Sequence, residues 1–285
     1  MKRKIVTIVV AGLAFLISLG LTLYPLIAAR YNEAHQSAIH AEYEQLVEQK
    51  DDTEKKRILE LARQYNEALK PGVTEAYSQD LLLWASENYA DQLNIAGNGI
   101  MGYVMIPAIQ VNLPIFHGTS DETLAKGVGH LLGSSLPIGG KGTHTVLTGH
   151  SGMANQKMFS DLADLKIGDV FYLDVLGERL AYKVQEINTV LPYDTSLLEI
   201  EPEEDLCTLV TCTPYGVNTH RLLVRGYRVP YVEQSGEETI LNEIPAVKST
   251  WEQQYAKGIG VGILAVTGLG VLVWAEWMIW RKRHG

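Results

Sequence analysis

A cysteine and an arginine flank a short connection between two runs that are typical of β-strands. Cys212 ends the β-branched run Thr208-Leu-Val-Thr-Cys212, and a second strand-like run follows at Arg221–Val229. The residues between them are rich in Pro, Gly and Asn, which favour a loop. A hairpin of this kind returns Arg221 to Cys212, where a guanidinium can favour the thiolate or donate hydrogen bonds to the oxyanion of an attacked carbonyl. Arg225 and Arg228 remain alternatives to Arg221.

A cysteine nucleophile also needs a group that carries protons, and histidine is the usual one. His150 ends the run His144-Thr-Val-Leu-Thr-Gly-His150, where a strand gives way to a loop, and loops on a rigid scaffold are common places for catalytic groups. His144 and His220 are its rivals. Adjacent strand residues face opposite ways, so His220 and Arg221 should not both face the thiol. The two remaining candidates, His117 and His130, lie in Gly-rich segments and are interpreted as surface residues.

The sequence has two cysteines, and their spacing argues against a disulfide. Five strand steps place the backbones of Cys207 and Cys212 about 16 Å apart, whereas a disulfide needs roughly 7 Å or less. Their odd spacing also points the two side chains to opposite faces of a strand. No zinc-ligand spacing is present, and Gly139-Gly-Lys-Gly142 lacks the other positions of a phosphate-binding loop, so no metal or cofactor is expected.

Two apolar runs lie near the ends of the sequence, at residues 5–29 and 258–280, and each exceeds the roughly 20 residues that a membrane-spanning helix needs. Basic residues precede the first run and follow the second at 281–285. Because positive residues stay on the cytoplasmic side, both termini are expected inside and residues 30–257 outside. A cleaved signal peptide is the alternative for the first run.

The formal net charge of the chain is −9. Both basic clusters lie at the expected inner ends, so the exterior segment holds the acidic surplus. This composition argues against a nucleic-acid partner and against adhesion to an anionic membrane surface.

The segment between the apolar runs divides into a helical part and a strand-rich part. Helical patterns cover about 32–69, up to Pro71-Gly72, and about 77–93. Many short strands then predict a small barrel or a sandwich. The expected strands are Gly102–Ile106, Val111–Ile115, His144–Thr148, Val170–Val175, Arg179–Val190, Leu206–Thr211 and Arg221–Val229.

Around these residues the sequence resembles the sortases. Thr208-Leu-Val-Thr-Cys212 is similar to their Thr-Leu-x-Thr-Cys motif, Leu147-Thr-Gly-His150 is similar to their His motif, and Arg221 matches the arginine of the following strand. The resemblance covers about residues 100–230. It implies a mainly β fold, a closed eight-stranded barrel, here with N-terminal helices and two transmembrane helices. It also implies a membrane-anchored enzyme that faces a Gram-positive cell wall.

Within the family the chain looks most like class C, the pilin polymerases. Supporting segments are Thr211–Gly226, Leu113-Pro-Ile-Phe-His-Gly-Thr-Ser120 and the C-terminal apolar run. The resemblance implies that Cys212 attacks the Thr–Gly bond of a Leu-Pro-x-Thr-Gly-like sorting signal and that a lysine amine of a pilin subunit resolves the thioacyl enzyme. His150 is then the acid and base, and Arg221 positions the substrate and stabilises the oxyanion.

The class C lid motif is the one departure from the family pattern. An Asp-Pro-aromatic plug is expected ahead of the barrel, but this chain has Lys70-Pro-Gly-Val-Thr74 there. We expect a lid within about residues 70–95, with Asp80, Trp84 and Tyr77 as candidate plug residues.

The resulting division of the chain places an anchor at 1–29, a helical region at 30–99, the catalytic barrel at 100–230, a linker at 231–257, a second span at 258–280 and a basic tail at 281–285. Three alternatives remain: a sortase that anchors proteins to peptidoglycan, a secreted cysteine peptidase, and a tethered β-domain without enzymatic activity.

Overall fold

The computed structural model describes residues 2–69, 79–151, 157–231 and 257–262 of the chain. The chain forms two units, Met1–Pro25 with Val247–Gly285, and Leu26–Ala246. The site residues predicted from the sequence all belong to the second unit.

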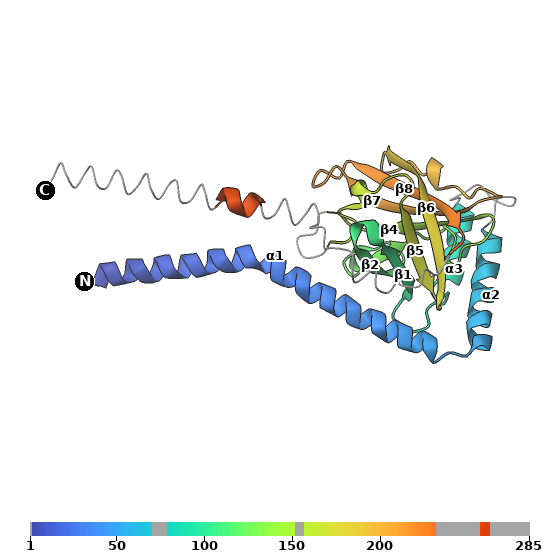
Figure 1. Cartoon of the computed structure of the whole chain (residues 1–285), viewed down its shortest axis with the longest axis horizontal. Coiled ribbons are helices and arrows are strands. Elements are labelled where there is room, and N and C mark those ends of the chain that lie inside the picture. The colour runs from blue at the N-terminus through green and yellow to red at the C-terminus, as the bar shows by residue number, and fades with distance from the viewer. Residues whose placement is uncertain (1, 70–78, 152–156, 232–256, 263–285) are drawn as a thin grey trace. The chain divides into compact units, whose positions relative to one another are not determined.

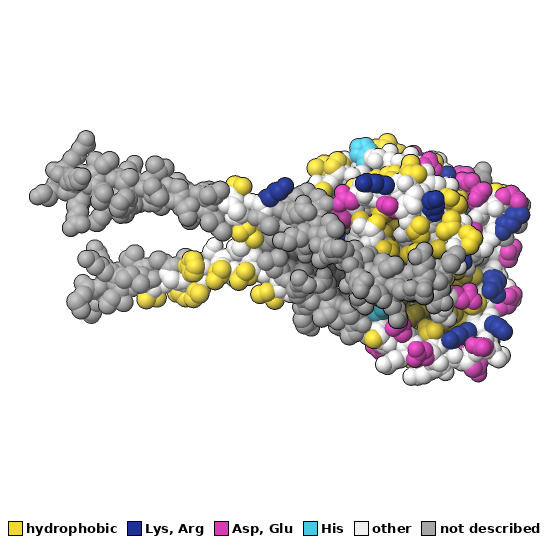
Figure 2. Space-filling model, in the orientation of Figure 1, with side chains coloured by type: hydrophobic (Ala, Val, Ile, Leu, Met, Phe, Trp, Pro, Cys, Tyr) yellow, Lys and Arg dark blue, Asp and Glu magenta, His cyan; other side chains and the backbone are white. Residues whose placement is uncertain are grey.

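The first unit contains the N-terminal part of helix α1 (Lys2–Glu48) and a helical segment at 257–262. Several apolar side chains of α1 are exposed, among them Val9, Phe15 and Ile17. Figure 2 shows hydrophobic side chains, in yellow, on the surface of this helix. Within the described residues, no helix combines the length and the apolar character needed to cross a membrane. Most of the second expected span, from residue 263 onward, lies outside those residues.

In the described part of the second unit, eight strands close into a barrel with the order β1-β2-β3-β4-β7-β8-β6-β5 (Figure 1). The closed eight-stranded barrel predicted from the sequence is confirmed, and the sandwich alternative is wrong. Closure pairs every strand on both sides, so no sheet edge is left open. The strand bounds are β1 Ile100–Ile106, β2 Val111–His117, β3 Val128–His130, β4 Thr143–Thr148, β5 Val170–Val175, β6 Glu178–Val190, β7 Asp205–Thr213 and β8 His220–Val229.

Two of the neighbouring pairs, β2–β3 and β4–β7, are parallel, and the other pairs are antiparallel. The parallel β4–β7 pair matters for the site, because it joins segments 62 residues apart in the register Thr148↔Val210. Both strands run in the same direction, so the residues that follow their C-terminal ends emerge at the same end of the barrel.

The sequence did not predict β3, and the interpretation of His130 as a surface residue is wrong. Val128–His130 has only three residues with a glycine in the middle, so it shows neither alternation nor a β-branched run. Its position between β2 and β4 buries it completely, and His130 is 0% exposed.

The helical segment expected as one unit at about 32–69 is broken at residues 49–51. Helix α1 ends at Glu48, and α2 (Asp52–Ala68) begins after Asp51, whose carboxylate accepts a hydrogen bond from the backbone N–H of Glu54 at 2.8 Å. This is an N-cap, which satisfies a backbone donor that has no partner inside the helix. The helical spacing of apolar residues predicts that Leu61, Tyr65 and Leu69 lie on one buried face. Tyr65 and Leu69 are buried, but Leu61 is exposed, and Leu59, Ala62 and Asn66 are buried as well.

Two polar side chains fasten the helices to the barrel. The amide of Asn66 in α2 donates to the carbonyl of Leu136 at 3.2 Å and accepts from its N–H at 2.7 Å. The hydroxyl of Tyr43 in α1 donates to the carbonyl of Met101 at 3.2 Å and accepts from the N–H of Leu176 at 3.1 Å. Each side chain satisfies buried backbone groups that the barrel ladder leaves open.

Helix α3 covers Gln79–Tyr89, so the second predicted helix ends before residue 93, and residues 77 and 78 lie outside the described residues. Ala85 and Tyr89 are buried, and the hydroxyl of Tyr89 contacts the Nδ1 atom of His130 at 2.8 Å and accepts from the N–H of Gly118 at 3.0 Å. Helix α3 is therefore part of the packed domain. Shorter helical turns occur at Pro107–Ile109, α4 Asp121–Leu124, Leu162–Asp164 and Ser196–Leu198.

Candidate active site

The hairpin of β7 and β8 places Cys212 directly opposite Arg221. Side chains of directly opposed residues in an antiparallel pair lie on the same face, with their Cβ atoms about 5 Å apart. Cys212 and Arg221 are both partly exposed. The following pair is Thr213↔His220, so His220 lies on the opposite face of the hairpin from Cys212.

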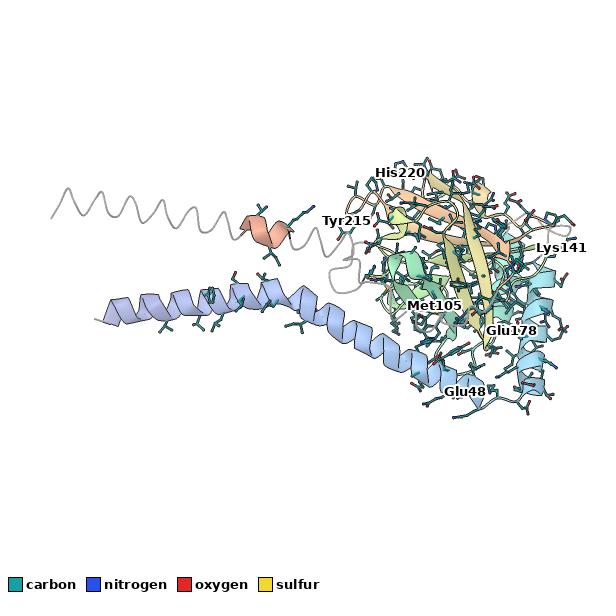
Figure 3. All side chains as sticks on the ribbon, viewed as in Figure 1. Glu48, Met105, Lys141, Glu178, Tyr215 and His220 are labelled. Atoms are coloured by element: carbon teal, nitrogen blue, oxygen red, sulfur yellow. The ribbon has the colours of Figure 1, made fainter. Side chains whose placement is uncertain are left out.

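The loop between β7 and β8 has the conformation that its composition suggests. Gly216 and Asn218 adopt positive φ angles of 73° and 62°, a region that glycine and asparagine tolerate best. The Arg221 guanidinium donates from Nη1 to the carbonyls of Asn218 at 3.2 Å and His220 at 3.0 Å. Figure 3 shows Tyr215 and His220 near this end of the barrel, and Lys141 at the other end.

The other two arginines of β8 are engaged elsewhere. Arg225 lies opposite Thr208 and forms ion pairs with Glu186 at 2.8 Å and Glu201 at 2.9 Å. Arg228 lies 3.9 Å from a carboxylate oxygen of Asp205, near the start of β7. Of the three arginines of β8, Arg221 is therefore the one that lies opposite Cys212.

His150 continues the β4 chain alongside β7. The N–H of Gly149 donates to the carbonyl of Val210 at 3.0 Å, which extends the parallel ladder by one step past Thr148. The Thr211 hydroxyl donates to the carbonyl of Gly149 at 2.8 Å, and the Ser151 hydroxyl donates to the carbonyl of Cys212 at 2.8 Å. Since Thr148 pairs with Val210, alternation places the side chains of His150 and Cys212 on the same face. The three predicted catalytic residues thus occupy neighbouring positions on adjacent chains, in the order His150, Cys212, Arg221.

The rival His144 is a buried structural residue. It is 0% exposed, its Nδ1 atom lies 2.7 Å from the carbonyl of Glu199, and its Nε2 atom lies 2.7 Å from the hydroxyl of Thr208. Burial lowers its pKa to about 4, so the ring is neutral at neutral pH. With both ring nitrogens in hydrogen bonds, His144 has no free position for proton transfer.

His130 and His117 lie away from this row, at the paired ends of β2 and β3. Burial lowers the pKa of His130 to about 4, and its Nε2 atom lies 2.8 Å from the carbonyl of Ser135. The two ring nitrogens of His117 lie 2.9 Å and 2.8 Å from the carbonyls of Gly99 and Gln92. His117 therefore joins the barrel to the segment after α3, whereas His130 contacts Tyr89 within α3 and Ser135.

The two cysteines are free, and they differ in their surroundings. Cys207 is 0% exposed, and burial raises the pKa of its thiol well above the usual range, which keeps it protonated and inert. Cys212 is partly exposed at the end of β7. Of the two thiols, Cys212 is the one that a reagent can reach.

A small apolar cluster lies on the face of the sheet that carries Cys212. Val210 and Leu223 oppose each other in the β7–β8 register, two residues before Cys212 and after Arg221, and they pack with Val146 and Leu198. Leu131, Val190 and Leu197 are partly buried against this cluster. Since the four side chains of the cluster are at most 7% exposed, it is a small packed core next to the thiol and not a surface for a ligand.

Of the three candidate plug residues, the structure describes the side chain of Trp84 and not those of Asp80 and Tyr77. Trp84 of α3 is half-buried, and its ring stacks on that of Tyr65 in α2 at a centroid distance of 5.3 Å. Asp80 is the second residue of α3, and its side chain is not described. Tyr77 lies outside the described residues, as does the rest of 70–78. Because Ala85 and Tyr89 of α3 are buried, a deletion of the whole expected lid would also remove core residues.

Thr211 and Ser151 were not singled out from the sequence. Their acceptors lie 62 and 61 residues away along the chain, and no local pattern announces such partners. Across the described ranges, no group of three His, Cys, Asp or Glu residues could hold a metal ion.

A family model described as the sortase domain matches residues 104–229, a range that runs from β1 to the end of β8. Sortase C1 from Streptococcus agalactiae is 44% identical over 68% of this chain and 100% of that chain, with a TM-score of 0.62. The chain belongs to the sortase family. Sortases are cysteine transpeptidases, and the row of His150, Cys212 and Arg221 lies within the matched sortase domain.

Further sortases are similar over a comparable or smaller range. A structure of Streptococcus pneumoniae sortase C, whose description refers to pilin substrate specificity, is 42% identical over 68% of this chain and 97% of that one, with a TM-score of 0.59. A sortase A from Streptococcus agalactiae is 29% identical over 147 residues, 50% of this chain and 57% of that protein. The chain spans less than two thirds of the length of the curated sortases it matches.

Proposed function

We propose that the protein is a membrane-anchored class C sortase that polymerises pilins. Cys212 attacks the carbonyl carbon between Thr and Gly of a Leu-Pro-x-Thr-Gly-like sorting signal. The C–N bond breaks, the Gly amine leaves with a proton from His150, and a thioester joins the substrate to Cys212. A lysine amine of a pilin subunit then attacks the thioester and loses a proton to His150. The products are an isopeptide bond and the free thiol.

The observation that supports this most directly is the row formed by the end of β4, β7 and β8. Cys212 lies opposite Arg221 in the hairpin, and His150 follows a strand that runs parallel to β7. Arg221 donates hydrogen bonds to the oxyanion that forms at the attacked carbonyl, a contribution that grows as negative charge develops.

The choice of a pilin lysine as the acceptor is supported by the sortase C structures that resemble the chain. These include one from a pilus island of group B Streptococcus, 40% identical with a TM-score of 0.62, and the pneumococcal one described above. The curated relatives named sortase A, at 28–29% identity, keep peptidoglycan anchoring as the second candidate.

Anchoring in the membrane is supported by the sequence. The apolar runs 5–29 and 258–280 are bounded by basic residues at their outer ends, and this pattern places both termini in the cytoplasm and the barrel outside. A membrane-impermeant maleimide applied to intact cells then labels Cys212, since Cys207 is fully buried. Labelling only after the cells are lysed contradicts this orientation.

The acceptor is tested by competition. The detergent-solubilised full chain is incubated with a sorting-signal peptide and two amines, a lysine-containing pilin-like peptide and a peptidoglycan cross-bridge peptide. The proposal predicts a branched product that carries the acyl group on the lysine Nζ atom, identified by fragmentation mass spectrometry. Transfer only to the cross-bridge peptide supports the anchoring sortase, and hydrolysis alone supports a peptidase. The Cys212→Ala variant is the blank for all three products.

A further inference from the structure

The hydrogen bonds that join β4 to β7 change from backbone–backbone bonds to side chain–backbone bonds at the active site. Backbone groups pair the two strands up to Gly149, whose N–H donates to Val210. Beyond that point two hydroxyl groups continue the connection. Thr211 donates from β7 to the carbonyl of Gly149, and Ser151 donates in the opposite direction to the carbonyl of Cys212, both at 2.8 Å.

These two hydroxyl bonds lie on either side of His150 along the chain. One fixes the residue before the histidine, and the other fixes the residue after it. Thr211 is buried at 3% exposure, so its bond is protected from water, whereas Ser151 is half-buried. Since the acceptor of Ser151 is the backbone of the nucleophile itself, the Ser151 bond couples the position of the His150 main chain directly to that of Cys212.

Phe159 also contacts the segment around His150. Its N–H donates to the carbonyl of His150 at 3.0 Å, and the side chain is fully buried. Its ring lies so close to Gly149 that a Cβ atom there would come within 2.7 Å of it. The Phe159 ring therefore blocks movement of Gly149 toward it, and the Ser151 bond limits separation of the residue after His150 from Cys212.

We propose that Ser151 is a positioning residue that holds His150 in register with Cys212. The inference rests on the proposed function for the roles of His150 and Cys212. Ser151 takes part in no covalent step; its hydroxyl continues the connection to β7 after the last backbone bond, from Gly149 to Val210. A displacement of about 1 Å in a catalytic group can cost 10²-fold in rate, so the hydroxyl affects the chemical step more than substrate binding.

A matched pair of substitutions isolates the hydroxyl. Ser151→Thr keeps it, and Ser151→Val has the shape of Thr without it. Ser151→Ala is the smaller second variant if the valine side chain disturbs folding. The control is Ser86→Ala, because Ser86 in α3 also donates a short bond to a backbone carbonyl, that of Leu83 at 2.7 Å.

Two measurements are made on the detergent-solubilised full chain. The first is kcat and KM for acylation by a sorting-signal peptide. We expect kcat to fall by about tenfold or more in Ser151→Val and Ser151→Ala with KM little changed, and to stay near wild type in Ser151→Thr and Ser86→Ala. The second is the pH profile of iodoacetamide alkylation of Cys212, with Cys207 silent because it is buried. We expect the Val and Ala profiles to approach that of His150→Ala.

The proposal is overturned if Ser151→Val and Ser151→Thr behave alike in both measurements, or if Ser151→Ala changes no more than Ser86→Ala. If the wild-type chain forms no acyl adduct, the proposed sorting reaction fails. The alkylation profiles then still decide the role of Ser151, because that measurement needs no sorting signal.

Discussion

Cys212 and Arg221 lie directly opposite each other across the β7–β8 hairpin, and their side chains share one face of the barrel. The same register places Arg225 opposite Thr208, four residues before Cys212, where Glu186 and Glu201 hold its guanidinium. Two arginines of one strand and one face therefore have different surroundings, and this difference can be tested.

Substitution of Arg221 by alanine is expected to slow formation of the acyl enzyme by about 10²–10³-fold, because it removes a donor to the developing oxyanion. Arg225→Ala is the matched control. It loses two partly exposed ion pairs, which costs about 1 kcal/mol of stability or less, and leaves acylation per folded molecule close to wild type. Single-turnover acylation with a sorting-signal peptide measures both variants. A larger loss in Arg225→Ala than in Arg221→Ala would refute the assignment.

His150→Ala is expected to lower acylation by about 10²–10⁴-fold, the usual contribution of a positioned acid and base. His220 provides the control, since it lies one residue from Arg221 in the same hairpin but on the other face, opposite Thr213. His220→Ala should therefore leave the acylation rate close to wild type. Equal losses in the two variants would mean that the end of β4 does not supply the proton carrier.

The sequence predicted the hairpin pair because its parts are local. Two β-branched runs joined by a Pro-, Gly- and Asn-containing loop can return only to each other, so Arg221 had to come back near Cys212. The position of His150 is a different matter. It depends on the parallel pairing of β4 with β7, a contact between distant segments that no local pattern encodes. From spacing alone, His144 and His220 remained alternatives to His150 as the proton carrier. The resemblance to the sortase His motif selected His150.

The structural predictions that were wrong have physical causes. Strand β3 is too short to show alternation, so the buried His130 looked like a surface residue. The break between α1 and α2 could have been found, because Asp51 followed three residues later by Glu54 is an N-cap signal. Leu61 fits a helical pattern of apolar residues with Tyr65 and Leu69, which are buried, but Leu61 itself is exposed while Leu59 and Ala62 are buried.

The buried histidines predict a loss of stability in acid. Burial lowers the pKa of His130 and of His144 from the ordinary value of 6.5 to about 4. Between these pH values the unfolded chain binds protons that the folded chain excludes, so the free energy of unfolding falls as the pH falls from 6.5 to 4. Each histidine contributes about 3 kcal/mol to this loss.

Denaturant unfolding of the full chain in detergent at pH 4 to 8 measures this effect. His144→Asn should reduce the slope of unfolding free energy against pH in the acid range, whatever it does to the stability at neutral pH. His220→Ala should leave the slope unchanged. A free energy of unfolding that stays level between pH 6.5 and 4 would contradict the neutral, buried state of both rings.

Asn66 is expected to contribute to stability through its two bonds to Leu136. Asn66→Ala leaves the buried N–H of Leu136 without its partner, whereas the Leu136 carbonyl keeps its bonds from the Ile138 N–H and the Thr145 hydroxyl. The unsatisfied N–H should lower the free energy of unfolding by about 2 kcal/mol. Gln64→Ala in the same helix removes only an exposed contact with Glu60 and should change it by about 0.5 kcal/mol or less. Equal effects in the two variants would show that α2 does not depend on this buried amide.

The central claim, that Cys212 is the nucleophile of a sorting reaction, is tested most directly by intact-mass analysis. The full chain is incubated with a Leu-Pro-x-Thr-Gly-containing peptide without an added amine, and the reaction is quenched in acid. The account predicts a mass increase equal to the peptide acyl fragment that ends at Thr, mapped by digestion to Cys212 and missing in Cys212→Ala. An adduct that persists in Cys212→Ala, or a wild-type chain that stays unmodified while its thiol is accessible to maleimide, would contradict it.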